Sequence, residues 1–89
     1  MQSRTTRCFR EAFEKLPSDV KKRARKAFKI WKKNPSHPSL RFKIIQAKEQ
    51  VYSVRISLGW RAVGTRTGDV MTWFWIGSHA EYEQLISML

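Results

Sequence analysis

The residues best suited to chemistry gather near the end of the chain, directly after an apolar run at residues 70–76. His79 brings an imidazole, Glu81 a carboxylate and Tyr82 a phenol. An imidazole gains and loses a proton near neutral pH, which suits it to general acid or base catalysis. A single histidine where a helix begins is more often a capping or surface residue, so its role depends on what lies beside it. These side chains are the candidates for proton transfer.

Two arginines on either side of a turn are candidates for holding phosphate. Arg55 and Arg61 flank Gly59, and a guanidinium offers a planar fork that matches phosphate oxygens. Exposed arginines on strands are common, so the pair gains meaning only from its neighbours. Antiparallel pairing of successive strands brings the end of the last strand, with His79, close to Arg61. We therefore expect Arg55, Arg61, His79 and Tyr82 to converge on one concave patch of the sheet.

Other chemistries lack the residues that they need. His37 lies far from His79 in sequence and next to Pro38, and Cys8 is the only cysteine, so no set of zinc ligands forms. There is no glycine-rich phosphate loop, and Ser78 cannot form an acyl-transfer triad with His79 by adjacency alone. We expect neither a metal nor another cofactor.

Two amphipathic helices are predicted in the first third of the chain. The first follows the threonines at positions 5 and 6, either of which can cap it, and Pro17 ends it. Ser18 is the predicted cap of the second, which ends before Pro35. Their apolar faces indicate an antiparallel helical hairpin packed on a sheet, with Phe28 and Trp31 buried against it.

The hydrophobic period then changes to two, which predicts strands at residues 41–45, 51–57, 60–66 and 70–76. Alternation along the last strand predicts that Trp73 and Trp75 share one face, opposite Phe74 and Ile76. Ser78 is the predicted cap of a C-terminal helix. We expect a single α+β domain over residues 1–89: two N-terminal helices packed on a four-stranded, mainly antiparallel sheet, with a short C-terminal helix. An additional N-terminal strand has no support in the pattern.

The charge is high and unevenly spread. The chain has 18 Lys and Arg against 7 Asp and Glu, a net charge of +11, and residues 67–89 contain no Lys or Arg. Such a field attracts a polyanion such as RNA or an acidic protein segment, although a basic helix face can also be simply solvated. The candidate RNA-binding cations on the second helix are Lys22, Arg25, Lys26, Lys29 and Lys33, and those around the first two strands are Arg41, Lys43 and Arg55.

The single cysteine and the lack of a signal-peptide pattern predict a cytoplasmic protein. The longest uncharged apolar run is far too short to cross a bilayer, so no contact with a membrane is expected.

Four stretches resemble the RelE/ParE superfamily of toxins from bacterial type II toxin–antitoxin modules. They read SRTT, NPSHPSLRFK, VYSVRISLGWRAVG and WFWIGSHAEYEQL, and the last two are typical of the RelE-like cytotoxin branch. The resemblance implies a microbial ribonuclease-like fold, a cognate antitoxin as partner, and cleavage of mRNA in the ribosomal A site. The ribosome and mRNA would then be partners too, and DNA would be reached only indirectly, through an antitoxin complex.

The resemblance also implies roles for individual residues. Attack of the RNA 2′-hydroxyl on the adjacent phosphate needs a stabilised anionic phosphorane and two proton transfers. Arg61 would hold the scissile phosphate, assisted by Arg55 and Lys43. His79 would be the acid or base and Glu81 its complement. An aromatic ring, either Tyr82 or a strand tryptophan, would stack on or orient a base.

Two other functions are compatible with the sequence. One is a ParE-like DNA gyrase inhibitor with no chemistry of its own, which DNA-cleavage complexes in cells would reveal. The other is a non-catalytic RNA-binding domain, which tight RNA binding without cut ends would reveal.

Overall fold

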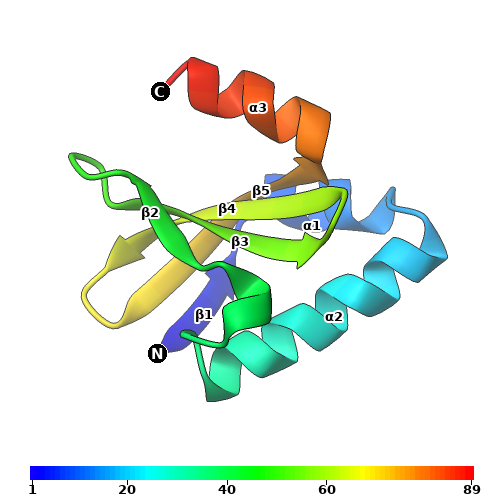
Figure 1. Ribbon diagram of the computed structural model, residues 1–89, viewed down its shortest axis with the longest axis horizontal. Helices are drawn as coiled ribbons and strands as arrows, with labels where there is room; N and C mark the ends of the chain where they lie inside the picture. Colours follow the sequence, from blue (N-terminus) through cyan, green and yellow to red (C-terminus); the bar gives the residue numbers. More distant parts are fainter.

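A five-stranded mixed sheet separates two layers of helix (Figure 1). The computed structural model describes residues 1–89, and the strand order is β1-β5-β4-β3-β2. The α+β class and the order of helices and strands from α1 onward confirm the prediction. The elements are β1 (Gln2–Thr5), α1 (Arg7–Glu14), α2 (Ser18–Lys33), the 3₁₀ helix η1 (Pro38–Leu40), β2 (Lys43–Gln46), β3 (Val51–Ser57), β4 (Trp60–Thr67), β5 (Val70–Ser78) and α3 (His79–Ser87).

The prediction of four strands was wrong, because β1 adds a fifth at one edge of the sheet. This strand runs parallel to β5, and its residues from Gln2 to Thr5 pair with Val70 to Trp73. All four β1 residues are exposed, so the strand has no alternating pattern that a sequence could display. It is held by backbone pairing and by the indole Nε1 of Trp73, which donates a hydrogen bond to Ser3 Oγ at 3.1 Å. The other three strand pairings are antiparallel.

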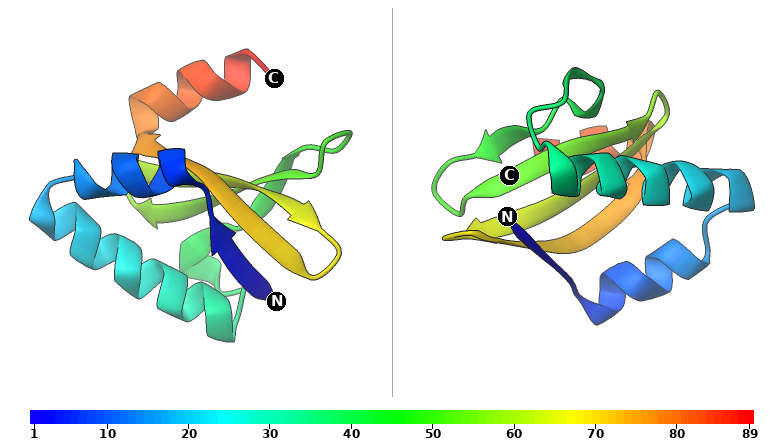
Figure 2. Two further views of the ribbon diagram at one scale, coloured as in Figure 1. Left: turned by 180° about the vertical axis from the view of Figure 1, so that it is seen from behind. Right: turned by 90° about the horizontal axis from the view of Figure 1, so that it is seen from below.

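The two N-terminal helices cover one face of the sheet and diverge from a short connection (Figure 2). The hydroxyl of Thr6 caps α1 by accepting a hydrogen bond from the Phe9 N–H at 3.1 Å. The predicted cap of α2 was wrong. Ser18 is already the first helical residue and Pro17 occupies the cap position, with no side-chain hydrogen bond. Proline suits this place because its fixed φ leads directly into the first turn.

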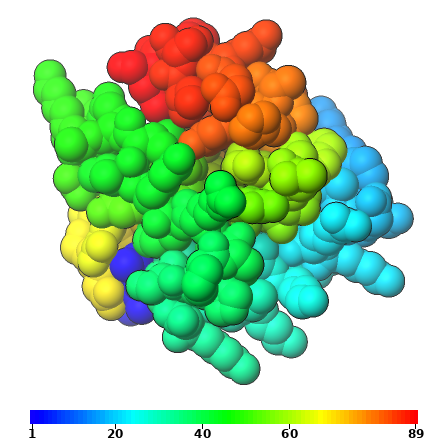
Figure 3. Space-filling model, viewed as in Figure 1, coloured from blue at the N-terminus to red at the C-terminus, as the bar shows by residue number.

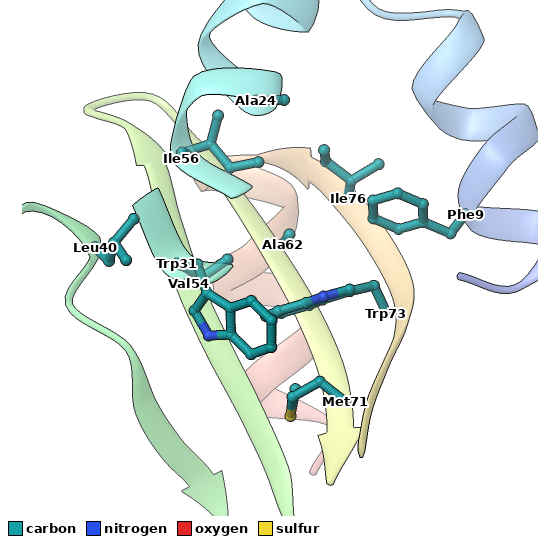
Figure 4. Packing of buried hydrophobic residues seen from close by; sticks show 11 residues of the cluster. Phe9, Ala24, Trp31, Leu40, Val54, Ile56, Ala62, Met71, Trp73 and Ile76 are labelled. Atoms are coloured by element: carbon teal, nitrogen blue, oxygen red, sulfur yellow. The ribbon is translucent and has the colours of Figure 1, made fainter. Parts of the chain in front are cut away.

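The main core lies between these helices and the sheet (Figure 4). Trp31 of α2 and Trp73 of β5 are 1% and 0% exposed, and their rings meet edge to face at 5.4 Å. Such edge-to-face pairs add to the stabilisation that burial provides. The predicted burial of Trp31 is confirmed. The ring centroids of Phe28 and Trp73 lie 5.1 Å apart, but Phe28 is only partly buried.

A β-bulge overturns the predicted faces of β5. Trp73 and Trp75 pair with consecutive residues of β4, so Phe74 is an extra residue without a partner. One extra residue reverses the in-and-out alternation beyond it. Trp73 and Ile76 therefore pack in the main core, whereas Phe74 and Trp75 pack on the opposite face under α3.

The third helix covers that opposite face and begins where β5 ends. The Ser78 hydroxyl accepts a hydrogen bond from the Glu81 N–H at 3.2 Å, and Glu81 Oε1 accepts one from the Ser78 N–H at 3.0 Å. This reciprocal capping box confirms the predicted cap. The helix is anchored by a small cluster of Tyr82 with Val51 and Val63. No helix in the structure has both the length and the apolar character needed to cross a bilayer.

Candidate active site

A pocket of about 210 Å³ opens between the first turns of α3 and the sheet. Figure 3 shows the elements that form it meeting on one face: α3 in orange and red, the β2 region in green and the β3–β4 hairpin in yellow-green. The structure brings together Arg55, Arg61, His79 and Tyr82, which were expected to converge. The lining residues are Arg41, Lys43, Ser53, Arg55, Arg61, His79, Tyr82, Glu83 and Ile86.

The β3–β4 turn positions both Arg61 and the start of α3. Arg55 and Arg61 are directly opposite each other across the two strands. The Nη1 atom of Arg61 donates hydrogen bonds to three carbonyl oxygens of the turn, those of Ser57 at 2.7 Å, Trp60 at 2.9 Å and Leu58 at 3.2 Å. In the same turn, the carbonyl at position 59 accepts a hydrogen bond from the His79 N–H at 2.7 Å. One rigid turn therefore fixes the guanidinium and the backbone that carries the imidazole.

Four cations surround the pocket, and none of them forms an ion pair with a carboxylate. Arg55 and Arg61 come from adjacent strands and Lys43 from β2. Arg41, expected in a strand, instead follows η1 with a left-handed φ of 44°. Partial burial, and then the charge of Arg55, lower the pKa of Arg61, although a guanidinium stays protonated at physiological pH. Uncompensated positive charge of this kind favours a bound anion.

His79 has a carboxylate partner, which is Glu83 rather than the predicted Glu81. The Nε2 atom of His79 lies 3.2 Å from Glu83 Oε1, and the two side chains are 47% and 57% exposed. Glu81 points into the capping box, where hydrogen bonds from the Ser78 backbone and hydroxyl lower the pKa of its carboxyl. Sequence reasoning missed Glu83. The signal was its spacing of one helical turn from His79, which puts the two on the same helix face.

Tyr82 supports the pocket from below. Its ring is only 5% exposed, lies 6.1 Å from the His79 ring, and its hydroxyl donates a hydrogen bond to Ser53 Oγ at 3.0 Å. A ring so deeply buried cannot offer a face to a base, and neither can Trp73 in the main core. Base stacking by these two residues, which the sequence led us to expect, is therefore incompatible with their burial. Tyr82 instead ties α3 to β3 through its hydrogen bond to Ser53.

The five predicted cations of α2 do not reach this pocket. They are exposed on the helix layer that covers the other face of the sheet. They form a basic surface of their own, which consists of Lys22, Arg25, Lys26, Lys29 and Lys33.

Comparison with known families settles what kind of protein presents this pocket. The family model described as the ParE-like toxin domain matches residues 18–84. The chain belongs to the ParE-like toxin domain family. This ParE-like domain is therefore a toxin of the RelE/ParE superfamily, as the four sequence stretches indicated. A search of curated proteins finds no match.

Solved toxin structures share the fold of this ParE-like domain. RelE in the RelB–RelE antitoxin–toxin complex from Methanococcus jannaschii aligns with a TM-score of 0.73 at 14% identity, over 92% of this chain and 96% of that one. YafQ from E. coli strain BL21(DE3) aligns with a TM-score of 0.71 at 10% identity, over 91% and 96%. The isolated E. coli RelE toxin aligns with a TM-score of 0.64 at 16% identity, over 99% and 98%. At such low identity the likeness shows the fold alone.

Proposed function

We propose that this domain is the toxin of a toxin–antitoxin module and an endoribonuclease that cuts ribosome-bound mRNA. The observation that carries the proposal is the group of four unpaired cations around an imidazole that has its own carboxylate. A structural role does not require such groups to meet, because like charges at close range repel. An RNA phosphate would relieve that repulsion, and the imidazole beside it would move the protons.

The cations would act on the phosphate. Arg61, already fixed by the β3–β4 turn, would hold the non-bridging oxygens of the scissile phosphate. Arg55 opposite it and Lys43 would add positive charge as the phosphorane develops. Charges that are in place before the reaction stabilise the transition state without reorganisation. Arg41 would contact a phosphate or sugar at the mouth of the pocket.

The reaction would run as an internal displacement. The ribose 2′-oxygen loses its proton to a base and bonds to phosphorus, while the bond from phosphorus to the 5′-oxygen breaks. The 5′-oxygen takes up a proton, and the products are a 2′,3′-cyclic phosphate and a 5′-hydroxyl. His79 would carry one of these protons, and Glu83 would stabilise the imidazolium that exists while the proton is held.

The remaining predicted residues would support His79. Tyr82 would keep the imidazole over the sheet through its buried bond to Ser53. Glu81 would orient it indirectly, because the capping box fixes the first turn of α3. Neither of these residues would need to touch the RNA.

An antitoxin and the ribosome are the proposed partners. Two of the structurally similar toxins are described in complex with an antitoxin, RelE with RelB and YafQ with DinJ. The basic surface of α2 would bind an acidic antitoxin segment or ribosomal RNA, which are both polyanions, and its affinity should fall as the salt concentration rises.

The test is to induce the toxin in cells and map new mRNA 5′ ends, with and without translation. We expect cut ends that depend on translation, and we expect His79→Ala to abolish them. His37→Ala is the matched control, because His37 is the other histidine and lies outside the pocket. Intact mRNA together with DNA-cleavage complexes would instead indicate a gyrase inhibitor. Tight RNA binding without cut ends would indicate a non-catalytic RNA-binding domain.

A further inference from the structure

A second pocket, of about 380 Å³, lies between α2 and β3 and shares Arg55 with the candidate active site. This α2–β3 pocket is distinct from the first, because its walls come from α2, η1 and the end of β3 rather than from α3. Its lining residues are Arg23, Lys26, Ala27, Ile30, Ser39, Leu40, Arg55, Ile56 and Ser57.

The two pockets approach each other where one edge of the sheet is open. The short strand β2 pairs with β3 only at Val51, Tyr52 and Ser53. Beyond these residues β3 has no neighbouring strand on that side, so its last part borders η1 and α2 instead. Arg55 lies on this uncovered part of β3. Its side chain can therefore line pockets on both sides of the sheet edge.

The lining of the α2–β3 pocket matches the parts of a nucleotide. Arg23, Lys26 and Arg55 supply positive charge, and none of them forms an ion pair. Lys21, by contrast, is neutralised by Glu14 at 3.5 Å. The hydroxyls of Ser39 and Ser57 and the partly exposed side chain of Ile30 complete the pocket. Phosphate suits the cations, ribose suits the hydroxyls, and the volume lies within the roughly 300–1,000 Å³ typical of small-ligand sites.

We infer that the α2–β3 pocket binds a nucleotide of the same RNA strand, next to the one cut in the candidate active site. Arg55 would then contact two phosphates of the strand, one in each pocket. The inference rests on the proposed function, which it deepens by assigning a second subsite on the same RNA strand beside the cut. The other apolar residues of the lining, Ala27, Leu40 and Ile56, are buried in the main core.

The test measures binding of fluorescent 2′-O-methyl RNA, which cannot be cut because the attacking hydroxyl is blocked. Probes of two nucleotides and of four to six nucleotides are titrated into the purified toxin at one salt concentration. The double variant Arg23→Ala with Lys26→Ala removes two cations from the pocket. The control, Arg4→Ala with Lys48→Ala, also removes one arginine and one lysine, but from exposed positions outside both pockets and outside the basic surface of α2.

We expect the longer probes to lose about ten- to a hundred-fold in affinity with the pocket variant, which is the range for charge-assisted hydrogen bonds. The two-nucleotide probe should lose much less, and the control variant should lose little with either probe. Ser39→Trp fills the exposed mouth of the pocket without changing its charge, so it should also weaken binding of the longer probes only.

Equal losses in the pocket variant and its control would overturn the inference, because they would reflect net charge alone. It would also be overturned if an acidic peptide, polyglutamate, competed for the pocket while probe length made no difference. The experiment can support or refute the subsite independently of the proposed cleavage of RNA. A length-dependent loss in a toxin that never cuts RNA would support the subsite and refute cleavage, whereas cutting with no effect of the pocket variant would do the reverse.

Discussion

Replacing Arg61 should affect the rate of cleavage far more than the free energy of unfolding. Replacement by glutamine removes the hydrogen bonds from Nη1 to the turn carbonyls, each with a net contribution to stability of about 0.5–1.5 kcal/mol after exchange with water. It also removes a cation that is unfavourable in the folded state, since partial burial and the charge of Arg55 both lower the pKa of Arg61. The two effects oppose each other, so we expect a net loss of unfolding free energy below about 2 kcal/mol.

The expected effect of Arg61→Gln on cleavage is much larger. Removing one preorganised group that stabilises a developing charge costs about 10² to 10³ in rate, or about 2.7–4 kcal/mol. Arg61→Lys keeps the charge but not the planar fork, so it should recover only part of that rate. The assay is single-turnover cleavage of ribosome-bound mRNA, with urea unfolding of the same preparations.

Arg66→Gln is the matched control for this experiment. Arg66 also lies on β4 and also donates to a turn carbonyl, that of Gly68 at 2.9 Å, but it does not line the pocket. Its replacement should leave the rate within about three-fold of the wild-type rate, as expected for a surface change of this size. Equal losses of rate in Arg61→Gln and Arg66→Gln, or a loss explained by unfolding, would refute the role given to Arg61.

Three further predictions concern stability. Trp31→Ala should lower the unfolding free energy by about 3–5 kcal/mol. Phe28→Ala should lower it by less, because the Phe28 ring is only partly buried. Urea unfolding would measure both values, and equal losses would contradict the packing described above. Glu81→Gln should cost about 0.5 kcal/mol at neutral pH, because a carboxyl with a lowered pKa stabilises the fold while ionised. That difference should shrink as the pH falls below the ordinary value of 4.5, and a difference unchanged in acid would contradict the capping role. Gly77→Ala should cost about 1–3 kcal/mol, since a Cβ there would lie 2.7 Å from the Trp75 ring, and an unchanged melting temperature would contradict this.

The sequence predicted those parts of the fold that follow from strong local patterns. The period of two after Pro38, the short turns around Gly59 and Gly68, and the uncharged aromatic run of β5 together define three antiparallel strands in order. Short turns leave little choice of neighbour, so the meeting of Arg55, Arg61 and His79 also followed. These residues are close because of the order and pairing of the strands, which the short turns in the sequence predict.

The parts that were missed depend on contacts that a pattern does not contain. The bulge at Phe74 depends on how two whole strands fit, and it moved Trp75 to the α3 face. Strand β1 is exposed throughout, so nothing in its composition distinguishes it from a loop. The pattern predicted Glu81 as the partner of His79, but the Ser78 cap binds that nearer carboxylate and leaves Glu83 to pair with the imidazole.

The central claim is that the pocket around Arg61 and His79 cuts RNA through its own 2′-hydroxyl. The most direct measurement is the chemistry of the new 3′ ends after purified toxin acts on ribosomes that carry a defined mRNA. We predict 2′,3′-cyclic phosphate ends from the wild type and from His37→Ala, and a loss of about 10² to 10⁴ in their rate of formation from His79→Ala. Ends that carry a 3′-hydroxyl, or a His79→Ala toxin that cuts at the wild-type rate, would contradict it.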